Sequence, residues 1–223
     1  MTRARDDDTP IPILWTDALF VVVAKPAGCL VVGAPGRSGP TLIDRLTRQL
    51  GERMVAVHRL DEDTTGTLVV ARGVEARKEI EPIFRAHAAE RVYLALVARV
   101  PSPSAGRIES KLAVGDDGVV RSTGAKQGER AVTVYRTIAR RDEGALLECR
   151  LETGRRNQIR AHLAELGAPI VGDRKYGWRA RASGLRPSRP MLHAWRIAFD
   201  HPRTGARITV EAPPVEDELR PPA

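Results

Sequence analysis

The most informative stretch of the chain reads His58-Arg59-Leu60-Asp61-Glu62-Asp63-Thr64-Thr65-Gly66. It is polar and loop-forming, and it lies between two apolar runs, 55–57 and 67–70, that are typical of strands. Loops between strands are where functional groups are commonly mounted. On pattern alone, an aspartate such as Asp61 is more often a turn or capping residue than a catalytic one. Its assignment therefore depends on the surrounding sequence.

The surrounding sequence predicts many short strands and few helices. Helical spacing of apolar residues predicts three helices, at 42–50 after the cap Thr41, at 75–89, and from about 157 to 166. Pro82 either opens a second helical segment or kinks the 75–89 helix. We expect a long loop over 172–190, and strands in the following ranges: 18–24, 29–32, 55–57, 67–70, 92–97, 132–135, 145–151, 192–199 and 208–211. Clustered strands with few βαβ alternations favour an α+β fold with a mixed, largely antiparallel sheet.

Length and composition suit one globular domain. The chain has 223 residues, of which 42% are hydrophobic, enough for a stable core. Residues 1–12 are polar and proline-bearing, so we expect a flexible lead-in, one catalytic domain over 13–215, and a short tail at 216–223.

The charge balance favours a polyanionic partner. Lys and Arg number 36 against 28 Asp and Glu, for a net charge of +8, and basic side chains release condensed counterions from phosphate backbones. Cys29 and Cys149 form no CxxC pair, so we interpret them as buried thiols in a reducing compartment. With no signal-peptide core and no membrane-spanning stretch in the sequence, we expect a cytoplasmic protein that does not bind membranes.

A second motif and several shorter ones accompany the first. The second reads Thr153-Gly154-Arg155-Arg156-Asn157-Gln158-Ile159-Arg160-Ala161-His162-Leu163 and continues as GAPIVGD at 167–173 and Tyr176-Gly177. The shorter ones are Lys25-Pro26-Ala27-Gly28, RVYLALV at 91–97, Met191-Leu192-His193-Ala194 and His201-Pro202.

Taken in order, these segments resemble the RluA-type RNA pseudouridine synthases over about residues 18–212. Three positions depart from the family pattern. Arg156-Asn157 stands where the family shows threonine–histidine, Thr65 replaces a serine, and Arg91 replaces a lysine. The short lead-in resembles a minimal member that lacks the N-terminal RNA-binding module.

The resemblance implies the pseudouridine synthase fold and a set of site residues. It makes Asp61 the catalytic carboxylate acting on a flipped uridine, with Arg160 paired to it and keeping it ionised. Tyr93 would stack on the target base and assist proton removal at C5, Leu192 would line the pocket, and Arg59 would occupy the space that the base vacates.

The implied chemistry breaks the N1–C1′ bond, rotates the base and joins C5 to C1′. Asp61 could attack C1′, add to C6, or assist glycal formation, and the sequence leaves these routes open. No redox change, group donor or metal is required, so we expect no cofactor. The expected partner is structured ribosomal RNA, transfer RNA or both, with no obligatory protein partner.

The cationic run between residues 174 and 189 is interpreted as a phosphate-contacting surface rather than an ordinary solvated face. Its members are Arg174, Lys175, Arg179, Arg181, Arg186 and Arg189.

Two other functions are weighed against the isomerase. The first is a non-catalytic RNA-binding protein on the same scaffold, which an intact Asp61, Tyr93 and Arg160 argue against. The second is a metal-dependent nuclease using His58, Asp61 and Asp63, which activity that survives exhaustive chelation would exclude.

Overall fold

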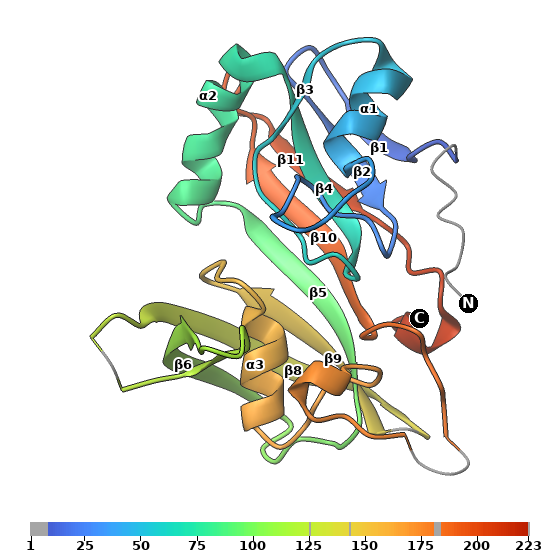
Figure 1. Ribbon diagram of the computed structural model, residues 1–223, viewed down its shortest axis with the longest axis vertical. Helices are drawn as coiled ribbons and strands as arrows, with labels where there is room; N and C mark the ends of the chain where they lie inside the picture. The colour runs from blue at the N-terminus through green and yellow to red at the C-terminus, as the bar shows by residue number, and fades with distance from the viewer. Residues whose placement is uncertain (1–8, 125, 143, 181–183, 223) are drawn as a thin grey trace. The chain divides into compact units, whose positions relative to one another are not determined.

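The computed structural model describes residues 9–124, 126–142, 144–180 and 184–222. The chain forms two compact units, one of residues 1–89 and 196–212 and the other of 90–195 and 213–223 (Figure 1). Each strand pair described within a unit is antiparallel. Together with three helices, these strands confirm the predicted α+β class and a largely antiparallel sheet.

The first unit is built around a buried strand, β2, that lies between β1 and β4. Its register places Phe20 opposite Ala71 and Lys25 opposite Gly66. β3 also pairs with β4, and the end of β10 pairs with β11. The strands are β1 (Ile13–Thr16), β2 (Phe20–Lys25), β3 (Met54–Ala56), β4 (Thr65–Arg72), β10 (Leu192–Asp200) and β11 (Arg207–Glu211). The strand β1 was not predicted from the sequence.

Two helices complete the first unit. α1 (Leu42–Leu50) begins at a capping box, in which the Thr41 side chain accepts from the Asp44 N–H and Asp44 bonds back to Thr41. It ends at Gly51, whose φ of 70° is left-handed, so the predicted helix and both of its end signals are confirmed. α2 (Gly73–Arg85) continues through Pro82 as one helix and buries Ile80 and Phe84 in the core.

The strand predicted at 29–32 is wrong. This segment forms no strand, because its carbonyls bond to the start of α1 instead of to a neighbouring strand. The Leu42 N–H donates to the Leu30 oxygen at 2.7 Å, and the Ile43 N–H donates to the Val31 oxygen at 3.3 Å. An apolar run whose carbonyls receive a helix N-terminus has the composition of a strand without its pairing.

The second unit is a five-stranded meander-like sheet in the order β5-β9-β8-β6-β7. β9 is buried on both faces over 145–147, whereas β6 alternates between exposed and half-buried residues over most of its length, as expected for a strand with one face toward water. The elements are β5 (Glu90–Val97), β6 (Ala105–Val114), β7 (Val120–Ser122), β8 (Glu129–Arg141), β9 (Gly144–Leu151), α3 (Gln158–Glu165) and the 3₁₀ turns η1 (Arg174–Tyr176) and η2 (Asp217–Leu219).

α3 is attached to this sheet through polar side chains. The Gln158 amide donates to the Val132 carbonyl at 2.9 Å and to the Thr133 hydroxyl at 3.0 Å, both on β8. His162, which is fully buried, bonds to Thr133 through Nδ1 at 2.9 Å and to Ser110 through Nε2 at 3.1 Å. Such buried networks fix the position of a helix because every member needs its partner. Among the described residues, no helix is long and apolar enough to cross a membrane.

The turn before β9 should tolerate no side chain. Gly144 has a φ of 141°, and an added Cβ would lie 2.1 Å from the Val97 carbonyl oxygen. We predict that Gly144→Ala lowers the free energy of unfolding by about 3 kcal/mol or more. The control is Gly118→Ala, which has a φ of 71° but open space around it, and should cost only about 1 kcal/mol. Urea unfolding of both variants measures this, and equal losses would contradict the steric argument.

Candidate active site

Asp61 sits at the start of a tight turn in the first unit. The Thr64 N–H donates to the Asp61 carbonyl at 3.1 Å, and β4 begins at Thr65. The Asp61 side chain is half-buried, Leu60 before it is buried, and Arg59 is exposed. The turn therefore carries a carboxylate and a long cation on either side of an anchoring leucine.

The turn is attached to β2 by the buried side chain of Lys25. This residue is 1% exposed, and its ammonium donates to the Glu62 carbonyl at 2.7 Å and to the Pro26 carbonyl at 2.8 Å. Burial lowers the pKa of Lys25 from 10.5 to about 8, although the charges of Cys29 and the acidic turn residues act in the opposite direction. Lys25 thus holds the Glu62 carbonyl, one residue beyond Asp61.

His58 has a structural environment. Its Nε2 accepts the Val69 N–H at 3.1 Å, and its ring stacks on Phe84 with centroids 4.4 Å apart. A nitrogen that accepts a backbone N–H cannot also ligate a metal. In the described part of the chain, no three His, Cys, Asp or Glu residues are grouped so that they could hold a metal ion.

Tyr93 and Leu192 are both buried residues of the second unit. Tyr93 lies on β5 opposite Cys149 of β9 and is 7% exposed. Leu192 begins β10 and is 3% exposed, and its carbonyl accepts a hydrogen bond from Arg189 at 3.0 Å. The Met191 carbonyl accepts from the Leu96 N–H at 3.0 Å, so this segment is tied to β5.

Arg160 is held by Asp173, a partner that the sequence reasoning missed. Nε and Nη2 donate to the two carboxylate oxygens at 2.6 and 2.9 Å, and Nη1 donates to Asn157 at 3.3 Å. The guanidinium also lies over the Tyr176 ring, 5.0 Å from its centroid. Asp173 is 1% exposed and accepts from the Tyr176 N–H as well. The GD pair at 172–173 was the available signal, and the pairing of Arg160 with Asp61 stays a prediction.

The backbone before α3 departs from ordinary geometry at Asn157, whose φ is 51°. Asparagine tolerates this left-handed conformation better than most residues. The next residue, Gln158, accepts from the Thr153 hydroxyl at 2.7 Å and from the Arg155 N–H at 3.0 Å. The loop between β9 and α3 is thereby folded back onto the helix, with Arg156 exposed.

The predicted phosphate-contacting run is exposed only in part. Arg174, Lys175, Arg179 and Arg186 are exposed, and Arg181 lies outside the described residues. The inclusion of Arg189 is wrong: it is 7% exposed, and Nε and Nη2 both donate to Glu216, at 3.0 and 2.6 Å. This internal ion pair ties the segment to the C-terminal region, so Arg189 has a structural role.

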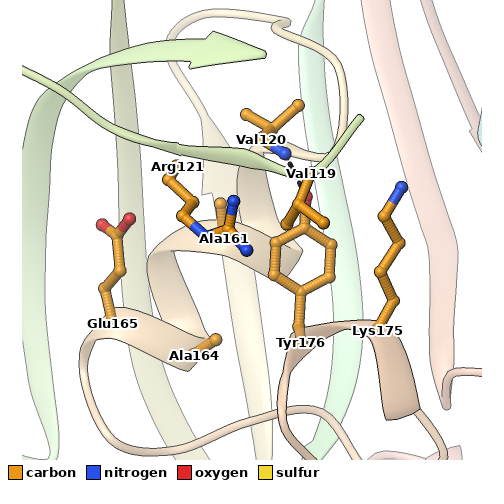
Figure 2. Close-up of a pocket in the computed structure, with 8 residues that line it drawn as sticks. All are labelled: Val119, Val120, Arg121, Ala161, Ala164, Glu165, Lys175 and Tyr176. Atoms are coloured by element: carbon orange, nitrogen blue, oxygen red, sulfur yellow. Dashed lines mark hydrogen bonds between the residues drawn. The ribbon is translucent and has the colours of Figure 1, made fainter. Parts of the chain in front are cut away.

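A pocket of about 310 Å³ lies beside this run in the second unit. Figure 2 shows the Tyr176 ring within it, with the hydroxyl directed at the Val120 N–H that donates to it at 3.1 Å. Its charged groups already have protein partners, since Lys175 donates to the Gly118 carbonyl at 3.0 Å and Arg121 pairs with Asp117 at 2.8 Å. The lining residues are Val119, Val120, Arg121, Ala161, Ala164, Glu165, Lys175 and Tyr176.

Comparison with known proteins identifies the family. The model of the RNA pseudouridylate synthase family matches residues 19–165, which include Asp61, Tyr93 and Arg160. The chain belongs to the RluA-type RNA pseudouridine synthases. It is therefore an isomerase that acts on RNA, and the resemblance seen in the motifs is confirmed.

Relatives in this family match nearly the whole chain. Ribosomal large subunit pseudouridine synthase D of Pseudomonas aeruginosa is 36% identical over 95% of this chain and 71% of its own length. The enzyme of the same name from Xanthomonas campestris is 37% identical over 98% of this chain and 70% of its own. Among solved structures, human RNA Pseudouridylate Synthase Domain Containing 4 has a TM-score of 0.73 at 25% identity, covering 90% of this chain and 87% of its own. These likenesses confirm the pseudouridine synthase fold.

The pKa of Lys25 predicts a specific pH dependence of stability. Between about pH 8 and 10.5 the unfolded chain holds a proton on Lys25 that the folded chain has lost. Stability contributed by this residue should therefore rise with pH across that window, by up to about 3 kcal/mol, and stay constant below pH 8. Urea unfolding of wild type and Lys25→Met at a series of pH values isolates the effect as a difference. A difference that does not change between pH 8 and 10.5 would refute the lowered pKa.

Proposed function

We propose that this enzyme isomerises specific uridines in structured ribosomal RNA, transfer RNA or both, with Asp61 as the catalytic carboxylate. The observation that carries the proposal is the Asp61 turn, which the buried Lys25 fixes through the Glu62 carbonyl. A carboxylate that must meet one atom of a ribose or a base needs such a fixed position. The names of the relatives from Pseudomonas and Xanthomonas, which refer to the large ribosomal subunit, favour ribosomal RNA among these substrates.

The target uridine is reached by base flipping. A base stacked within a helix presents neither C5 nor C1′ to a side chain, so the nucleotide must be extruded. Arg59 is exposed two residues before Asp61 and is long enough to enter the space that the base leaves. In this proposal Arg59 stabilises the RNA, and Asp61 acts on the extruded nucleotide.

Tyr93 and Leu192 receive the base. Tyr93 is held on β5, with its backbone paired to β9, so its ring has a fixed orientation on which a pyrimidine can stack. Its hydroxyl is the candidate group for proton removal at C5. Leu192 supplies an apolar wall and is held by the Arg189 bond to its carbonyl.

In this proposal Arg160 is the partner that orients Asp61. Asp173 fixes the guanidinium from one side with two hydrogen bonds, which restricts its rotation. A guanidinium has five N–H donors, and the bonds to Asp173 and Asn157 are compatible with a further bond to a carboxylate. A rigid cation of this kind stabilises a neighbouring carboxylate in the charged form.

The proposal assigns catalysis to residues 13–215 as one domain and places the enzyme in the cytoplasm. The described thiols support a reducing compartment. Cys29 and Cys149 are both free and buried, and burial raises the pKa of Cys149 to about 12.

We predict that Asp61→Asn lowers pseudouridine formation by on the order of 10⁴-fold or more while RNA binding persists, because an amide cannot act as a nucleophile. The substrate is large-subunit ribosomal RNA transcribed in vitro, and the readout is single-turnover pseudouridine formation. The matched control is Asp63→Asn, an exposed charge of the same turn, which should keep most of the activity. Comparable rates for Asp61→Asn and wild type would refute the assignment.

The exposed cations after α3 give a separate prediction. Replacing Arg174 and Arg179 together by alanine should weaken RNA binding and flatten the dependence of log affinity on log salt by about one unit, if both contact phosphates. Saturating RNA should restore most of the rate, since neither residue belongs to the Asp61 turn. The comparison is Arg136 and Arg140 of β8, also exposed, replaced together. An equal salt slope in the two double variants would show that Arg174 and Arg179 belong to an ordinary solvated surface and do not contact phosphates.

A further inference from the structure

In the part of the chain that the structure describes, Arg91 is a buried cation that forms no ion pair with an acidic side chain. It is 9% exposed, and its Nε and Nη2 have neither contact with water nor a hydrogen bond. Two other poorly exposed arginines of the same unit are paired, Arg160 with Asp173 and Arg189 with Glu216. An unpaired buried charge costs several times more than a paired one. A group kept at such a cost is expected to serve a ligand.

The remaining nitrogen of Arg91, Nη1, packs against Gly154 and takes up the space that a side chain there would fill. An added Cβ on Gly154 would lie 2.5 Å from Nη1 and 3.4 Å from Cζ. The backbone of Gly154 has no positive φ, so its conformation does not require glycine and only the space does. Gly154 is itself exposed. A side chain at 154 would therefore displace the guanidinium from this position.

The residues around the Arg91 guanidinium suit the binding of a phosphodiester. Arg91 and Tyr93 are two residues apart on β5, so their side chains leave the same face of the strand about 7 Å apart. That distance is close to the spacing of a base from the phosphate of its own or the adjacent nucleotide. Arg156 is exposed two residues beyond Gly154 and adds positive charge to the same loop.

We propose that Arg91, through the Nη1 that lies beside Gly154, binds a backbone phosphate of the RNA strand whose uridine stacks on Tyr93. The inference rests on the proposed function for the position of the base. Guanidinium and phosphate form strong charge-assisted hydrogen bonds, and the donor assigned to the phosphate is Nη1 of Arg91, which lies beside the exposed Gly154. The phosphate thus supplies the missing counter-charge, and binding fixes the strand next to the stacking residue.

The first test replaces Arg91 by methionine, which keeps the length and removes the charge. The probe is a 12-nucleotide oligouridylate, and affinity is measured from 50 to 300 mM salt. We expect weaker binding and a log–log salt slope that is smaller by about 0.7, the value for one phosphate of a single strand. The control is Arg140→Met, which removes an exposed charge from β8 and should leave binding nearly unchanged. An unchanged slope in Arg91→Met would overturn the proposal.

Thermal melting separates ligand binding from a structural role. Removal of an unpaired buried charge should raise the melting temperature of Arg91→Met without RNA, whereas loss of a structural residue would lower it. Oligouridylate should then raise the melting temperature of wild type more than that of the variant. A variant that melts lower and gains as much from RNA as wild type would contradict the proposal.

The second test adds a side chain at position 154, against the Arg91 guanidinium, and keeps Arg91 in the sequence. Gly154→Ala should weaken oligouridylate binding as Arg91→Met does, and it should have little further effect when combined with Arg91→Met. The control is Gly124→Ala, where an added Cβ meets nothing within 4 Å. Independent, additive losses would refute a shared site. Since none of these measurements uses turnover, failure of wild type to form pseudouridine would refute the proposed function alone.

Discussion

The buried ammonium of Lys25 is the interaction on which the candidate active site depends. Its two hydrogen bonds, to the Pro26 and Glu62 carbonyls, attach the polar turn that contains Asp61 to the end of β2. The bonds restrict the movement of the turn. Burial of a cation is unfavourable, and here it is offset by carbonyl bonds and by the acidic residues of the turn. Because burial lowers the pKa of Lys25 to about 8, the stability that this residue contributes rises with pH between about 8 and 10.5.

In the second unit, too, buried polar side chains hold a candidate site residue in position through hydrogen bonds. Asp173 is almost fully buried, and it fixes Arg160 through both carboxylate oxygens while also accepting from the backbone of η1. Gln158 and His162 join α3 to β8 in the same way, with side-chain bonds in place of an apolar interface. Hydrogen bonds between buried polar groups restrict the movement of both partners, because a shift of either one leaves a desolvated group unpaired. These bonds therefore fix the position of α3, which carries Arg160, relative to β8.

Arg91 stands apart from these satisfied groups. The fold pairs Arg160 with Asp173 and Arg189 with Glu216, but it leaves Arg91 buried, with Nε and Nη2 unbonded and Nη1 against Gly154. Stability lost at such a place is commonly exchanged for function, since a site already desolvated and charged binds an anion more strongly than an exposed one does. An RNA strand would complete the pairing that the protein alone does not make.

The sequence by itself determined the family, the α+β class and the local elements with strong signals. Ordered motifs around Asp61 and Arg160 carry the resemblance to the family, and Thr41 with Gly51 defined α1 because a helix cap involves only residues within about one turn of the helix end. Tertiary structure decided what depends on distant partners. The run 29–32 has a strand's composition but receives α1, Arg189 is buried on Glu216 and is not a surface cation, and Arg160 is held by Asp173. Local pattern cannot supply these outcomes, because burial and pairing are set by residues brought together only when the chain folds.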